Sequence, residues 1–333
     1  VAVEDQRRAG RVGGIILFAR NVESAEQLAD LTRTLHAAAK YPLLISIDQE
    51  GGVIAKMRAP SFSEVPGAMG LASSARGEEN AYAAYSIIGR EMKAVGMNWD
   101  YAPAIDLTYN RQNPTVGTRS FGTDPETVGA LASQAVKGLQ AHGVAACAKH
   151  FPGLGDTAID THVALATLNA PIEQLLTRDL IPYRAVIAAG IASIMTTHTV
   201  YTALDDTHPA TLSGVVINRM LRGELAYDGL IVSDCMEMKA IADNYTPEDY
   251  ATLGALAGLD MILVSHTVEA QSRAFDGLLK AVEDGRVPLS RIEDANVRIA
   301  KMKAMCAVTP YDLSVLRTPD ALETGVNIAR DSV

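Results

Sequence analysis

The sequence predicts an α/β fold, a (β/α)8 barrel of the TIM type, on three observations. Short apolar, β-branched segments alternate with longer amphipathic ones, as expected for repeated βα units around a buried parallel sheet. The length of 333 residues fits one such barrel, which takes about 250 residues and more with insertions. No GxGxxG turn follows an early strand, which argues against the rival open, doubly wound sheet.

Seven segments are predicted as strands from their apolar, β-branched composition. They are 13–18, 43–48, 97–103, 144–150, 192–198, 230–234 and 261–265. A closed barrel of eight strands leaves no exposed edge, whereas seven strands of this hydrophobicity would leave two. Residues 1–12 are polar and are interpreted as the end of a helix. We therefore expect the natural protein to begin earlier, with its first strand absent from this chain.

Helices are predicted between the strands from their caps and apolar faces. Ser24 and Gln27 form a capping box, and Asp124 followed by Pro125 is typical of a helix start. Further helices are predicted over 78–95, 172–189, 247–257, 269–283 and 289–304, and another begins at 319. Residues 1–308 are therefore expected to form the barrel and residues 309–333 an extension or linker towards a second, C-terminal α/β domain.

The composition excludes several classes of protein. A formal net charge of -10 opposes a nucleic-acid partner, which would require clustered Lys and Arg. The longest apolar runs are shorter than the roughly 20 residues of a membrane span, so we expect a soluble, cytoplasmic protein. Cys147, Cys235 and Cys306 lie far apart without CxxC spacing, which indicates neither a disulfide framework nor a zinc ribbon. The oligomeric state leaves no readable signal.

Reactive side chains stand at the ends of several predicted strands. Asp48, the adjacent pair Lys149 and His150, His198, and Asp234 each end an apolar segment. A single Asp or His in this position often only caps a helix or binds loop amides. The carboxyl ends of barrel strands meet at one mouth, however, so their convergence favours a catalytic site.

The segment KHFPGLGDTAIDTH, residues 149–162, carries the strongest signal for chemistry. Asp160 and His162 lie two residues apart, so in an extended loop the carboxylate orients the imidazole, which then serves as general acid or base. Asp and His also bind zinc. No His-x-His follows an early strand and the charge of Lys149 opposes a cation beside His150, so neither a metal nor another cofactor is predicted.

Six segments in order resemble the β-N-acetylhexosaminidase branch of glycoside hydrolase family 3, over nearly the whole length. They are GGIILFARN (13–21), ISIDQEGG (45–52), NWDYAPAIDL (98–107), NPTVGTRSFG (113–122), KHFPGLGDTAIDTH (149–162) and SDCMEMKAI (233–241). The resemblance implies retaining hydrolysis of terminal, non-reducing β-linked N-acetylglucosamine, with a role in carbohydrate metabolism and cell-wall recycling. The β-glucosidase branch lacks the Asp-x-His loop pair, which is present here.

The resemblance also implies roles for individual residues. The nucleophile falls on Asp234, and the acid/base, a His supported by an Asp on a mobile loop, falls on His162 and Asp160. The predicted substrate-binding residues are Asp48, Lys56, Arg119, Lys149, His150 and His198. Lys56 stands near a position where the family commonly has an Arg, and Cys235 stands where a second acidic residue is frequent.

Alternative functions stay open at this point. In retaining glycosidases the nucleophile and the acid/base lie about 5 to 5.5 Å apart. A neutral His in place of a second carboxylate repels an anion such as phosphate less strongly. Phosphorolysis of the same glycoside is therefore the alternative within this fold. A metal-dependent barrel hydrolase and a non-catalytic carbohydrate-binding protein are the others. The sequence does not distinguish a muropeptide, a chitin fragment or a glycoconjugate as the natural substrate.

Overall fold

The computed structural model describes residues 10–307 and 311–332, and its centre is a curled parallel sheet. Six strands pair in the order β1-β2-β3-β4-β6-β8, all in parallel. Their bounds are β1 Gly14–Ile16, β2 Leu44–Ile47, β3 Trp99–Asp100, β4 Ala145–Phe151, β6 Ser193–Thr196 and β8 Leu230–Ser233. Five of these strands lie within predicted segments, and β4 extends one residue beyond a sixth. The predicted α/β barrel architecture is confirmed.

The predicted strand over 261–265 is wrong, because only a single parallel bridge joins this segment to β8, between Val232 and Met261. The Ser233 hydroxyl oxygen accepts the bond from Leu263 N at 2.9 Å, in a place where a regular ladder uses a backbone carbonyl. The segment therefore follows β8 without becoming a regular strand.

Side chains connect the two edges of the sheet. The Phe18 ring, beyond β1, stacks on the His266 ring, beyond 261–265, with centroids 5.3 Å apart. Nearer the start of β1, Arg11 Nη1 lies 3.2 Å from Asp276 Oδ1. Within the described residues no backbone pairing joins these two edges. Residues 1–9, which we expected to form most of a helix end, lie outside the described part of the chain.

The predicted helices surround this sheet, with their caps as expected. Ser24 Oγ accepts from Gln27 N at 3.1 Å, although Gln27 Oε1 reaches Glu23 N rather than Ser24 N. Asp124 Oδ2 accepts from Thr127 N at 2.9 Å. The α-helices are α2 Ala25–Ala37, α3 Ala68–Ser73, α4 Gly77–Ala94, α5 Pro125–Gln140, α6 Ile172–Gln174, α7 Ile181–Ala188, α8 Lys239–Ala242, α9 Pro247–Ala257, α10 Val268–Glu283, α11 Leu289–Met305 and α12 Pro319–Asp331.

The helix predicted over 172–189 is present, but a π-helical segment, η3 Leu175–Asp179, separates α6 from α7 within it. Pro182 has no N–H to donate to residue 178, so the regular helical ladder cannot continue through it. Leu180 N instead bonds to Leu175 O at 2.9 Å, five residues back. A second π-helical segment, η5 Val215–Glu224, was not predicted, and short 3-10 turns occur at η1 Ala19–Asn21, η2 Gly117–Arg119, η4 Ala210–Leu212 and η6 Leu313–Val315.

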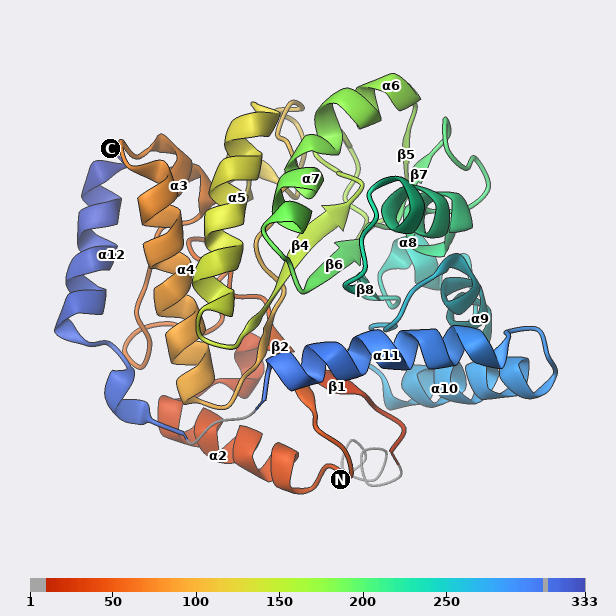
Figure 1. The fold of residues 1–333 in the computed structure, drawn as a ribbon, viewed down its shortest axis with the longest axis horizontal. Coiled ribbons are helices and arrows are strands. Elements are labelled where there is room, and N and C mark those ends of the chain that lie inside the picture. The colour runs from red at the N-terminus through yellow and green to blue at the C-terminus, as the bar shows by residue number, and fades with distance from the viewer. Residues whose placement is uncertain (1–9, 308–310, 333) are drawn as a thin grey trace.

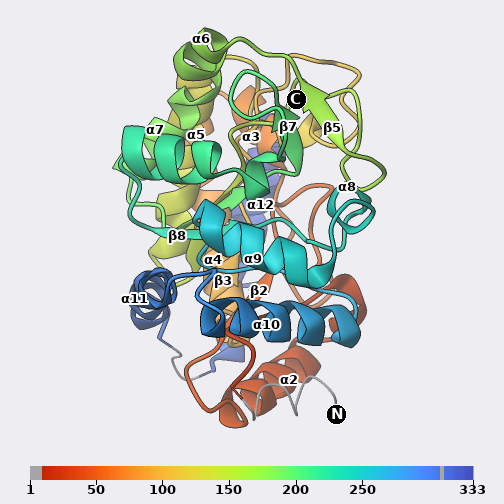
Figure 2. The ribbon, with the colours of Figure 1, turned by 90° about the vertical axis from the view of Figure 1, so that its right-hand side faces the viewer.

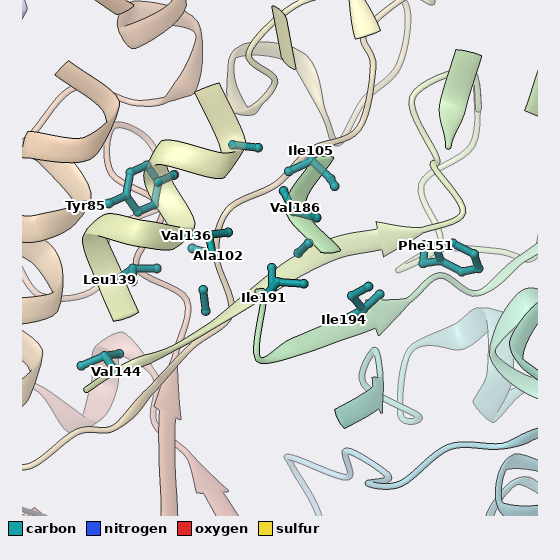
Figure 3. Packing of buried hydrophobic residues seen from close by; sticks show 14 of the residues in the cluster. Tyr85, Ala102, Ile105, Val136, Leu139, Val144, Phe151, Val186, Ile191 and Ile194 are labelled. Atoms are coloured by element: carbon teal, nitrogen blue, oxygen red, sulfur yellow. The ribbon is translucent and has the colours of Figure 1, made fainter. Parts of the chain in front are cut away.

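The main core lies between the outer face of the sheet and α4, α5 and α7 (Figure 1). Figure 3 shows Val136 and Leu139 of α5 and Val186 of α7 pointing towards the side on which Ile194 of β6 lies. A second cluster fills the inside of the curl around Trp99, where Met302 of α11 joins it. Helix α11 thus covers the amino-terminal ends of the strands and leaves the carboxyl ends open to a site.

Two further features frame those carboxyl ends. A small parallel pair, β5 Ala166–Leu168 and β7 Thr199–Tyr201, lies beyond β4 and β6, at the upper right of Figure 2. Helix α12 packs on α3 and α4 (Figure 1). The division of the chain at residue 308 stays a prediction. No helix in the described ranges has the length and apolarity needed to cross a membrane.

Candidate active site

A network of two cations and two carboxylates stands at the carboxyl ends of β2 and β4. Lys149 Nζ lies 2.7 Å from Asp48 Oδ1 and 2.7 Å from Glu50 Oε1. Arg119 binds Glu50 through two bonds, from Nη2 to Oε1 at 2.7 Å and from Nε to Oε2 at 2.9 Å. The structure therefore joins three predicted site residues, Asp48, Arg119 and Lys149, through Glu50, which sequence reasoning missed although it lies in the segment ISIDQEGG.

The charges of this network are balanced within a buried layer. Burial by itself would raise the pKa of Glu50, but the Lys149 and Arg119 cations outweigh burial and lower the pKa to about 2. Asp100, at the end of β3, behaves in the opposite way. Burial raises the pKa of Asp100 well above its ordinary value, and its Oδ2 has no hydrogen-bond partner in the described residues. Burial therefore acts on Asp100 without the cation pairing that outweighs it at Glu50.

His150 is fixed by a carboxylate that sequence reasoning also missed. Its Nδ1 lies 2.8 Å from Asp106 Oδ2, and both side chains are buried. Asp106 also accepts from Leu154 N at 2.9 Å, and thereby ties the start of the following loop to the same carboxylate. Burial raises the pKa of Asp106, but the charge and hydrogen bonds of His150 outweigh it and bring the pKa below its ordinary value. Asp106 lies in the segment NWDYAPAIDL, which was its only signal.

Asp234 directly follows β8 and is held by its own turn. Its Oδ1 accepts from Cys235 N at 2.7 Å, and its backbone N donates to Thr196 O at 3.3 Å. Burial raises the pKa of Asp234, but the charges of His198 and His150, with the bond from Cys235, bring the pKa below its ordinary value. The carboxylate is therefore ionised at neutral pH.

His198 supports the backbone beside Asp234. Its Nε2 lies 2.9 Å from Cys235 O and its Nδ1 lies 2.9 Å from Thr211 Oγ1. The ring is fully buried, and burial lowers the pKa of His198. Its Nε2 therefore contacts the residue after Asp234, and its predicted contact with a substrate stays a prediction.

The loop of residues 152–164 carries the pair Asp160 and His162 over this mouth. His162 Nδ1 lies 2.7 Å from Asp160 Oδ1, and His162 N donates to the same oxygen at 2.8 Å. The His162 side chain is 67% exposed, so it can meet a group that arrives from solvent. Thr161 O accepts from Ala240 N at 3.3 Å, which places the loop beside the turn that follows Asp234. The charge of His162 contributes to lowering the pKa of Asp234.

Lys56 lies to one side of these groups. Its backbone N donates to Gln49 Oε1 at 2.7 Å, and in the described residues this is its connection to the network. A cavity of about 390 Å³ flanks Glu50 and Arg119 rather than Asp234. Its other lining residues are Gly51, Gly52, Val53, Gly67, Ala68, Met69, Gly70, Ser73, Thr118 and Ser332. In residues 10–307 and 311–332, no three His, Cys, Asp or Glu side chains gather as a metal site would require.

Known proteins resemble this chain over most of its length. Residues 4–302 match the model of the glycosyl hydrolase family 3 N-terminal domain. The chain is 33% identical to a β-hexosaminidase of Thiobacillus denitrificans, over 99% of this chain and 91% of that protein. It is 32% identical to β-hexosaminidase A of Pseudoalteromonas piscicida, over 91% of this chain and 55% of that protein.

Solved structures show the same likeness. The structure of a glycoside hydrolase family 3 β-N-acetylglucosaminidase from Paenibacillus sp. str. FPU-7 is 41% identical, with a TM-score of 0.95. The match covers 99% of this chain and 65% of that one, so this chain spans only part of such longer relatives. The family match over most of the residues, together with these identities, settles the assignment. The chain belongs to glycosyl hydrolase family 3.

Proposed function

We propose that the chain is a retaining β-N-acetylhexosaminidase that removes terminal, non-reducing β-linked N-acetylglucosamine through a covalent glycosyl-enzyme. The observation that carries the proposal is the pair of His162 Nδ1 and Asp160 Oδ1, 2.7 Å apart, on a loop whose Thr161 O accepts from Ala240 N of α8, the helix that follows Asp234. Relatives named β-hexosaminidase and β-N-acetylglucosaminidase support the same substrate class.

In this proposal Asp234 is the nucleophile. Its depressed pKa keeps the carboxylate ionised, as attack on the anomeric carbon requires. His162 donates a proton to the leaving oxygen as the glycosidic bond breaks, and the sugar becomes esterified to Asp234. His162 then removes a proton from the incoming water, and the ester bond to Asp234 breaks as the new bond to the anomeric carbon forms. Asp160 orients the imidazole through Nδ1, which leaves Nε2 to carry the proton.

The buried network is proposed to hold the sugar hydroxyls. Asp48 accepts hydrogen bonds, while Lys149, Arg119 and His150 lie on neighbouring elements of the same mouth. Because Glu50 and Asp106 fix these cations and the imidazole, the donors are in place before a sugar arrives. Lys56 and His198 remain proposed contacts at the rim and beside Asp234.

The test compares Asp234→Asn and His162→Ala with the unchanged chain on aryl β-N-acetylglucosaminides. Asp234→Asn is expected to abolish turnover while the chain still unfolds in one cooperative transition, and near-normal activity would show that Asp234 is not the nucleophile. His162→Ala is expected to lose far more rate with poor leaving groups than with activated ones, because only the former need protonation. An equal loss of rate on both kinds of leaving group would show that His162 is not the general acid.

The same assay separates the alternatives. Aryl β-glucosides, added phosphate and a chelator are tested in parallel arms. Release of a sugar 1-phosphate at a phosphate-dependent rate would replace hydrolysis by phosphorolysis, and loss of rate with the chelator would indicate a metal enzyme. Binding of the glycoside without any turnover would indicate a non-catalytic carbohydrate-binding protein.

A further inference from the structure

The acid/base loop, residues 152–164, consists of two parts with different surroundings. Residues 154, 155 and 157 are buried, whereas Ile159 and Val163 are 46% and 63% exposed. Between Asp160 and His162, however, Thr161 is buried, and its carbonyl oxygen accepts from Ala240 N. The position of Asp160 and His162 therefore depends on this anchor and on how the first part of the loop is fixed.

The first part is anchored through its backbone. Asn113 Nδ2 donates to Leu154 O at 2.9 Å and to Gly155 O at 3.2 Å, and Asn110 Nδ2 donates to Thr157 O at 3.2 Å. A Cβ at Gly155 would lie 1.6 Å from Leu107 O, so the loop rests directly on the backbone that follows β3. These contacts fix the distance between the first part of the loop and the sheet.

A side-chain clamp fixes its direction. Asp156 Oδ2 accepts from Arg178 Nη2 at 2.5 Å and from Gln174 Nε2 at 3.2 Å. The guanidinium carbon of Arg178 lies 4.3 Å from the Tyr109 ring centroid, and Nη2 also binds Asp179 Oδ1 at 2.9 Å. Arg178 belongs to the π-helical segment η3, whose altered winding aims it at the loop.

The clamp holds at neutral pH. Burial raises the pKa of Asp179 to about 6 despite the opposing bonds from Arg178, so this carboxylate is mostly ionised at pH 7. The clamped pair is partly exposed, at 22% for Arg178 and 25% for Asp156, and ion pairs of this kind contribute little to global stability. Its main effect is therefore local.

We propose that Arg178 is a positioning residue for the acid/base: by holding Asp156 it sets where Asp160 and His162 stand above Asp234, without touching the substrate. This inference rests on the proposed function. Asp156 and Asp160 are four residues apart, a reach of at most about 14 Å, with Thr161 bound to Ala240 at the far end. Because the span is short, a shift at Asp156 changes the path of the chain between Asp156 and the Thr161 anchor, which carries Asp160. Misplacement of a catalytic group by about 1 Å can cost on the order of a hundredfold in rate.

The test uses Arg178→Gln, Arg178→Lys and the matched control Arg184→Gln, an exposed arginine of α7. Rates are measured on aryl β-N-acetylglucosaminides of graded leaving-group pKa, and each unfolding midpoint is measured. Arg178→Gln is expected to lower kcat/KM about 10- to 100-fold on poor leaving groups and less than about threefold on activated ones. Arg178→Lys is expected to recover part of the loss, and Arg184→Gln none of these effects.

The decisive arm repeats Arg178→Gln in a His162→Ala background, where the change is expected to cost nothing further because no acid remains to be positioned. A loss of equal size in that background, or the same loss on every leaving group, would overturn the inference. If His162→Ala itself shows no dependence on the leaving group, the proposed function fails and the inference fails with it. If His162→Ala shows the dependence and Arg178→Gln does not, only the inference fails.

Discussion

Glu50→Gln tests whether the buried network is a source of stability as well as a binding surface. In the folded chain the pKa of Glu50 is about 2 against an ordinary value of 4.5, a difference that corresponds to about 3 kcal/mol. The usual cost of breaking a buried ion pair is similar, since removing one partner lowers the free energy of unfolding by about 3 to 5 kcal/mol. The neutral amide of the variant would leave Lys149 and Arg119 with Asp48 as the one remaining carboxylate of the network.

The pH dependence identifies the cause. A carboxylate whose pKa is depressed on folding contributes stability above its unfolded pKa, and this contribution disappears as the pH falls through its folded pKa. The difference in unfolding free energy between the unchanged chain and Glu50→Gln should therefore shrink by about 2 kcal/mol between pH 7 and pH 3. Urea unfolding followed by the fluorescence of Trp99, the single and buried tryptophan, measures this difference.

Two variants serve as controls. Exposed Glu323→Gln should show a small difference in unfolding free energy and serves as the surface control. Asp100→Asn should show the opposite trend, since burial raises the pKa of Asp100 and the unchanged chain therefore loses stability as the pH rises above the ordinary value of 3.8, whereas the amide does not. A difference for Glu50→Gln that stays constant between pH 7 and pH 3 would refute the reasoning.

Three further changes test other parts of the fold. Asp260→Asn should lower the free energy of unfolding, measured in urea, by about 3 to 5 kcal/mol. The reason is that the buried Asp260 carboxylate lies 2.5 Å from Arg222 Nη2 and 2.7 Å from Arg291 Nη2. A loss below about 1 kcal/mol would contradict this expectation. Ser24→Ala should cost about 1 kcal/mol in the same assay, through the lost cap of α2, and Ser24→Thr should restore most of it. Gly155→Ala should lower the free energy of unfolding by about 1 to 3 kcal/mol and also reduce kcat, since its Cβ would collide with a backbone oxygen. An unchanged kcat would show that catalysis does not depend on the position of this loop.

Local sequence signals predicted the elements that depend on local physics. The caps at Ser24 and Asp124 lie where expected, and α9 begins at Pro247 and ends at Ala257 as predicted. Six of the seven strand segments are present, because an apolar, β-branched run between turns has few alternatives to a buried parallel strand. The strand predicted over 261–265 is wrong, because a competing serine hydroxyl changes the hydrogen bonding there, and the π-helical segment within 172–189 was not predicted.

The candidate site divides in the same way. Asp48, Lys149, His150 and Asp234 were visible because each ends an apolar run. Glu50 and Asp106 were not selected, although both lie in recognised segments. Nothing local marks a carboxylate as the partner of a cation nearly 100 residues away, such as Glu50 with Lys149. Its importance arises from burial beside two cations, which only the packed strands create.

The sequence by itself determined the family, the α/β barrel and the residues at the strand ends, because periodicity, capping and motif spacing are written along the chain. Only the tertiary structure decided which charges pair, which carboxyl group has a raised pKa and where the acid/base loop is held. Arg178 reaches Asp156 across 22 residues, and burial raises the pKa of Asp100. Ion pairing and desolvation depend on distance and dielectric in space, which sequence separation does not encode.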